Sequence, residues 1–87
     1  MTVVSHFNIF DMYQTVALVD EVTGEVRVMS SATMDNLGDT IAEYCLAEKA
    51  NHVHLFGDGN YALKLINDID RSTKGLYSAN KIGIEVN

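Results

Sequence analysis

The chain has 87 residues, of which 47% are hydrophobic and 21% charged, and its formal net charge is −6 at pH 7. This composition is typical of one globular domain, here residues 1–87, and excludes a disordered tail. Because the sequence opens without a basic segment and lacks an apolar run of about 20 residues, we expect a soluble domain with no membrane span. The single cysteine, Cys45, excludes an internal disulfide, which favours a reducing, cytoplasmic compartment.

Within the first thirty residues, segments 3–10 and 25–30 alternate as β-strands do, and residues 14–20 are apolar on both faces, as in a central strand. We predict strands over residues 3–10, 14–20 and 25–30. Gly24 lies between the second and third of these strands, where a hairpin loop can use its positive φ. Short loops join the three strands, so they should form an antiparallel meander.

From Thr33 the apolar spacing changes to the 3.6-residue period of an amphipathic helix. Thr33 or Asp35 is the predicted N-cap of this helix. Gly38 predicts a loose first turn, because glycine inside a helix costs about 1 kcal/mol relative to alanine. Cys45 falls on the apolar stripe and is predicted to be a small core residue.

A second strand and helix follow, and then a last strand. HVHLF at 52–56 predicts the strand, Asn60 is the predicted N-cap of the helix, and KIGIEV at 81–86 predicts the last strand. The order β-β-β-α-β-α-β predicts a single α/β (α+β) domain with one mixed sheet and parallel crossovers under the helices. Residues 14–19 and 52–57 are the most apolar strands and are expected to lie centrally.

This element order resembles the core of the ribonuclease H-like fold, and HVHLFGDGNYA resembles the fourth strand of that family. The resemblance implies a nuclease in which clustered carboxylates, among them Asp11 and Asp58, hold Mg²⁺ or Mn²⁺. Asn36 stands where the family has a glutamate, and Asp39 or Glu43 could replace that glutamate only with a shift of one or two helical turns. Because the catalytic set is incomplete, a metal-dependent nuclease is an alternative hypothesis.

GDGN at 57–60 follows a strand and precedes a helix, where a G-x-G-x-x-A motif can hold a dinucleotide pyrophosphate. Asp58 would repel that phosphate, and too few strands follow to supply a ribose-binding acid. We therefore favour a tight turn made by Gly57 and Gly59, with Asn60 capping the helix. A nucleotide or metal binder at this turn is a second alternative.

His52 and His54 are two residues apart on a predicted strand, so both project from one face and could be metal ligands, with His6 as a third. A hydrogen-bonded, metal-free histidine pair is the commoner arrangement. We therefore favour neither a metal nor a cofactor.

Acidic residues concentrate in the first half of the chain. Residues 1–48 contain eight acids and one base, whereas residues 49–87 contain four acids and five bases. This asymmetry suits a protein partner with a basic surface and disfavours nucleic acid. The candidate interaction residues are acids of the first half: Asp20, Glu21, Glu25, Asp35, Asp39 and Glu43.

We therefore expect a small acidic, non-catalytic protein-interaction module of the accessory, adaptor or inhibitor type, with self-association into a homo-oligomer as an alternative. Each catalytic constellation considered above is incomplete, whereas the charge segregation is a property of the sequence itself. Small acidic chains without a cofactor motif are common among viral and mobile-element accessory proteins. For such an origin the compartment would be the host cytoplasm.

Overall fold

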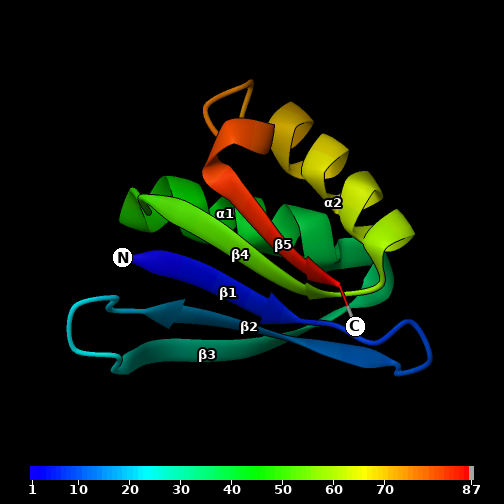
Figure 1. Cartoon of the computed structure of the whole chain (residues 1–87), viewed down its shortest axis with the longest axis horizontal. Helices are drawn as coiled ribbons and strands as arrows, with labels where there is room; N and C mark the ends of the chain where they lie inside the picture. Colours follow the sequence, from blue (N-terminus) through cyan, green and yellow to red (C-terminus); the bar gives the residue numbers. More distant parts are fainter. Residues whose placement is uncertain (87) are drawn as a thin grey trace.

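The computed structural model describes residues 1–86 as five strands, two α-helices and two 3-10 turns (Figure 1). The strands are β1 (Thr2–His6), β2 (Tyr13–Val19), β3 (Val26–Thr33), β4 (His52–Gly57) and β5 (Ile82–Val86). The helices are α1 (Leu37–Glu48) and α2 (Gly59–Ser72), and the 3-10 turns are η1 (Met34–Asn36) and η2 (Ala79–Lys81). The predicted order of elements is confirmed.

The five strands form one mixed sheet in the order β3-β2-β1-β4-β5. β1 pairs antiparallel with β2 and parallel with β4, β2 pairs antiparallel with β3, and β4 pairs parallel with β5. The predicted combination of a meander with parallel crossovers is therefore confirmed. β2 and β4 are interior strands, as expected, and β1, which the meander and the crossover share, lies between them (Figure 1).

Both helices cover the same face of the sheet. Val3 of β1 pairs in register with Leu18 of β2 and Val53 of β4, so these three buried side chains point to one side. α1 contacts β1 and β2, α2 contacts β4 and β5, and the two helices contact each other. The largest fully buried apolar side chains come from both layers: Leu37, Ile41, Leu55, Leu65 and Ile69. Burial of each contributes about 1.5–3 kcal/mol before conformational entropy is counted.

Two predicted boundaries are wrong for identifiable reasons. β1 ends at His6 and not at residue 10, because the side chain of Gln14 binds the backbone of Asn8 and closes a loop there. α1 begins at Leu37 after the 3-10 turn, with Asn36 in the N-cap position and no side-chain capping bond, so neither predicted residue caps it. Gly38, which was expected to loosen the first turn, lies within the regular helix, where a Cβ would come 2.8 Å from the Cβ of Asp68 on α2.

A buried tyrosine joins the end of α1 to the segment after α2. The hydroxyl of Tyr77 lies 3.0 Å from the carbonyl oxygen of Cys45 and 2.6 Å from that of Ala50, and both oxygens accept from it. Cys45 is a core residue as predicted, and burial raises the pKa of its thiol to about 12. Within residues 1–86 neither helix has the length and apolar character that a membrane span requires.

Candidate functional site

The loop between β1 and β2 is fixed by a buried glutamine. Gln14 is only 3% exposed, its carboxamide oxygen accepts from the Asn8 N–H at 2.8 Å, and its Nε2 donates to the backbone oxygens of Asn8 and Asp11, each at 2.9 Å. The side-chain oxygen of Asn8 in turn accepts from the N–H of Phe10 at 3.0 Å. These bonds replace the ladder hydrogen bonds that a longer strand would make, and they give the loop one backbone conformation.

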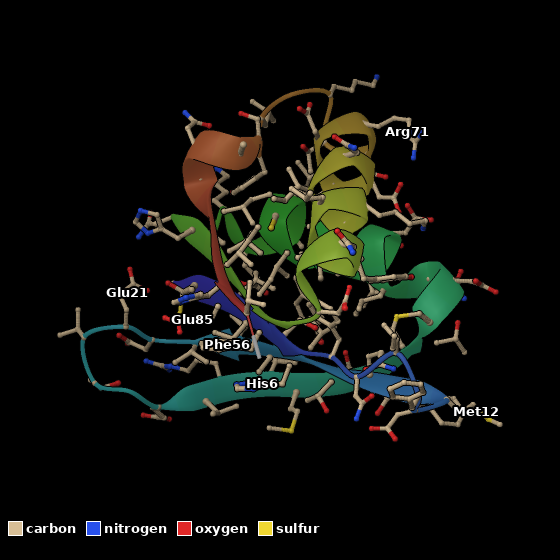
Figure 2. The ribbon with its side chains drawn as sticks, turned by 45° about the vertical axis from the view of Figure 1, so that its right-hand side comes forward. His6, Met12, Glu21, Phe56, Arg71 and Glu85 are labelled. Atoms are coloured by element: carbon tan, nitrogen blue, oxygen red, sulfur yellow. The ribbon has the colours of Figure 1, made fainter. Side chains whose placement is uncertain are left out.

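Large apolar side chains point outward from this loop. Phe10 is 89% exposed and Met12 74% exposed, and Ile9 and Tyr13 beside them are also exposed. In Figure 2 Met12 lies at the outer end of the loop, on the opposite side of the molecule from Glu21. Isolated apolar residues at a surface are ordinary, but four in five consecutive positions on a fixed backbone form a patch typical of interaction sites.

One predicted carboxylate lies in this loop and another lies beside it. Asp11 is the one in the loop, and it lines a cavity of about 220 Å³ together with His6, Gln14 and Phe56. Asp58 lines a neighbouring cavity of about 240 Å³ with Phe10. Phe7 and Asn8 contribute to both cavities. β1 and β4 are adjacent parallel strands, so the two acids follow strand ends on the same side of the sheet.

The other acids proposed for a nuclease lie on α1. The carboxylate of Asp39 accepts from the Ser72 hydroxyl at 2.9 Å, which links α1 to the end of α2. Glu43 lines a separate groove between α1 and β3. Among residues 1–86, no three side chains of His, Cys, Asp or Glu gather closely enough to hold a metal ion. The four acids therefore do not form one carboxylate cluster.

The GDGN segment was predicted to form a tight turn, but its glycines instead permit close packing. Neither Gly57 nor Gly59 has a positive φ. A Cβ at Gly57 would lie 2.6 Å from both the carbonyl oxygen and the ring of Phe7, so this glycine permits the close approach of β4 to the end of β1. The carboxylate of Asp58 accepts from the N–H of Tyr61 at 2.9 Å and caps α2. The prediction that Asn60 is the cap is therefore wrong.

The histidines share the face of the sheet that the helices do not cover. His6 stacks on Phe56 with ring centroids 4.3 Å apart, and His54 stacks on the same ring at 4.5 Å. Glu85 approaches His54 at 3.9 Å, and Figure 2 shows His6, Phe56 and Glu85 together in this region. His52 lies further along the strand, exposed on the same face. Phe56 separates His6 from His54, so the structure forms an aromatic stack where three converging ligands were considered.

The six acids proposed for interaction fall into two groups at opposite ends of β3. The first group lies at the β2–β3 turn: Asp20, Glu21 and Glu25. Hydrogen bonds from the backbone of Val22 and Thr23 lower the pKa of Asp20. The pKa of Glu21 is lowered to about 2, chiefly by the N-terminal ammonium group and then by Asn51.

The second group follows β3 along η1 and α1: Asp35, Asp39 and Glu43. These residues are spaced four apart, so they lie along one side of the helical segment. The six acids therefore form two separate surfaces. The turn group stabilises the local structure, because the carboxylate oxygens of Asp20 and Glu21 accept intramolecular hydrogen bonds.

No protein-family model matches the chain, and no match is found among curated proteins. The fixed apolar loop was missed in the sequence because residues 7–10 alternate like a strand. The available signal was Gln14, a polar residue at an inward position of an otherwise apolar strand, since a buried amide requires hydrogen-bond partners.

Proposed function

We propose that this chain is a small non-catalytic protein-interaction module that binds its partner through the β1–β2 loop. The observation that carries the proposal is a backbone-fixed loop that presents Phe10 and Met12 almost fully to solvent. Aromatic and methionine side chains are enriched in the buried centres of protein interfaces. A loop that is already ordered avoids much of the entropy cost of binding, so these side chains are suited to fill an apolar pocket of a partner.

Charge supports a partner whose pocket has a basic rim. Asp11 lies inside the apolar loop and Asp58 beside it, and the chain as a whole carries a net charge of −6. Carboxylates at the edge of a contact accelerate encounter with a basic surface and oppose an anionic lipid surface. The accessory or adaptor role and the cytoplasmic setting belong to this same proposal.

The test compares two pairs of substitutions that remove exposed apolar side chains. Phe10→Ser with Met12→Ser alters the loop, and Val22→Ser with Leu63→Ser is the control, since Val22 is 90% and Leu63 58% exposed elsewhere. All four side chains are exposed, so both variants should keep the thermal midpoint of the wild type. We expect the loop variant alone to lose a partner captured from the source cells by crosslinking. Equal capture by both variants would contradict the proposal.

A ribonuclease H-like nuclease is the second candidate, and one observation favours it. Asp11 and Asp58 follow the adjacent strands β1 and β4 at the same end of a mixed sheet with the element order on which the resemblance rests. The test is hydrolysis of an RNA·DNA hybrid with Mn²⁺ by the wild type and by Asp58→Asn. Asparagine also caps helices well, so this variant removes the charge while keeping α2 stable. Activity that disappears in the variant would replace the non-catalytic proposal.

A further inference from the structure

The edge formed by β3 is open, because no strand among residues 1–86 pairs with its outer side. β3 spans eight residues at one end of the strand order, and it lies at the lower margin of the sheet in Figure 1. The features that protect an edge strand, the charged Arg27 and a register irregularity opposite Leu18 and Val19, both lie near the start of β3, and residues 28–33 contain no proline and no charged residue. From Val28 to Thr33 the strand therefore offers regular backbone N–H and C=O groups to an added strand.

An acidic groove runs beside this edge on the helix side of the sheet. Its volume is about 300 Å³, and it is lined by Ser30 of β3 and by Thr40, Glu43, Tyr44, Ala47 and Glu48 of α1. The Tyr44 hydroxyl donates to the Ser30 hydroxyl at 2.9 Å and joins the two walls. Neither Glu43 nor Glu48 forms an ion pair within the part of the chain that the structure describes.

From these features we propose that β3 receives an extended, basic segment of the partner as an added strand, with its lysine or arginine side chains over the acidic groove. The inference rests on the proposed function in that the partner is a protein. Every second residue of an added strand would point to the helix side, and these residues repeat at about 6.8 Å. Glu43 and Glu48 are five residues apart on α1, which is about 7.5 Å along the helix axis and about 140° around it, so the two carboxylates lie on either side of the stripe of Thr40, Tyr44 and Ala47 that lines the groove.

The same charges argue against a second copy of the chain as the occupant of this edge. Pairing of β3 with β3 of another copy about a two-fold axis would bring two acidic grooves to the same junction, and each copy carries a net charge of −6. Like charges placed in this way oppose association, whereas a basic segment neutralises them. The residues between the basic ones would lie beside Met29 on the uncovered face, where small or apolar side chains fit.

The experiment titrates the isotope-labelled protein with a capped peptide of alternating lysine and valine, matched in length to β3. We expect amide shifts confined to β3 and the groove side of α1, and weaker binding when salt rises from about 50 to about 500 mM. A peptide with glutamate in place of lysine should not bind. A lysine peptide N-methylated at alternate residues along its pairing edge should bind at least tenfold more weakly, because its backbone cannot pair.

Two double variants distinguish the effect of the groove carboxylates on peptide binding from the effect of the overall charge. Glu43→Gln with Glu48→Gln should weaken binding of the lysine peptide by about tenfold, which is within the range for two exposed ion pairs. Asp70→Asn with Glu85→Gln removes the same charge from α2 and β5 and should weaken it by less than about threefold. Equal effects of the two variants, or equal binding of the N-methylated peptide, would overturn the inference.

The oligomeric state and the loop variants decide the remaining outcomes. A concentration-dependent dimer with protected β3 amides in the absence of peptide would assign the edge to a second copy and overturn the inference. Absence of peptide binding would overturn it as well, yet it would leave the proposed function intact if capture of a partner still depended on Phe10 and Met12. If the peptide binds but capture of the partner does not depend on the loop, strand addition at β3 would be supported and binding through the β1–β2 loop would be refuted.

Discussion

Replacement of Gln14 by methionine would remove the bonds that fix the β1–β2 loop while keeping an unbranched side chain of similar length in the core. Three hydrogen bonds of 2.8, 2.9 and 2.9 Å are lost. Each contributes about 0.5–1.5 kcal/mol. Asn8 is exposed, so water can form hydrogen bonds with the backbone groups of Asn8 that Gln14 no longer binds. We therefore expect the free energy of unfolding to fall by about 1.5–3 kcal/mol, in the lower half of the range for three such bonds.

The matched control is Ser5→Ala, since the Ser5 hydroxyl is fully buried and donates one hydrogen bond, of 2.9 Å, to the carbonyl oxygen of Thr15. Its expected cost is about 1 kcal/mol. Urea unfolding measures both costs, and amide hydrogen exchange measures protection of the Phe10 and Asp11 N–H groups. Protection should fall in Gln14→Met alone. If Gln14→Met costs no more than the control and the loop amides keep their protection, Gln14 does not order the loop.

Three further outcomes follow from single contacts. Gly57→Ala places a Cβ 2.6 Å from the carbonyl oxygen of Phe7, which cannot rotate away, so the urea midpoint should fall by the equivalent of about 1–3 kcal/mol. Glu21→Gln removes the partner of the N-terminal ammonium of Met1. The folded-state pKa of Glu21 is depressed from 4.5 to about 2, so the thermal midpoint of the wild type should exceed that of the variant above pH 4.5, and this difference should vanish as the pH falls towards 2. Tyr77→Phe removes the hydroxyl that donates to the buried carbonyl oxygen of Ala50, whereas the carbonyl oxygen of Cys45 still accepts from the N–H groups of Lys49 and Ala50, and the substitution should cost about 1–3 kcal/mol in urea unfolding.

The order of elements could be predicted because each change of hydrophobic period is a local property of the sequence. The period of two before Thr33 and the period of 3.6 after it distinguish the meander from α1 without any tertiary information. The end of β1 could not be predicted in this way. Residues 7–10 alternate as a strand does, and the competing bonds come from Gln14, whose contact with Asn8 exists only after the chain has folded back.

The capping of α2 shows the same limit. Asp58 and Asn60 are both good N-cap residues, and local preference cannot rank them. The close approach of Gly57 to Phe7 fixes the end of β4, and the carboxylate of the next residue then reaches the N–H of Tyr61. The choice is therefore made by packing between two strands that are far apart in the sequence.

The proposed interaction acids are close in sequence, but they lie on two separate surfaces because the chain reverses direction after β3 and continues along α1. Glu21 contacts the N-terminus and Asn51, a partner 30 residues away, so its low pKa reflects a structural link between three segments. Glu43 instead faces a groove that exists only because α1 packs beside β3. Counting of charge in the sequence could therefore indicate an acidic half, but it could not distinguish structural carboxylates from available ones.

The two proposed contact surfaces meet at one corner of the sheet. Tyr13, the last of the exposed apolar residues of the loop, pairs with Thr33 at the end of β3. A segment added along β3 would therefore finish beside the loop, and one partner could occupy both surfaces. Joint occupation would raise the effective concentration of the partner at each surface. The lysine–valine peptide should therefore displace the partner's segment from β3 while the same partner stays bound at the loop. Two separate partners would instead bind independently, and the peptide would displace one of them completely and leave the loop-bound partner in place.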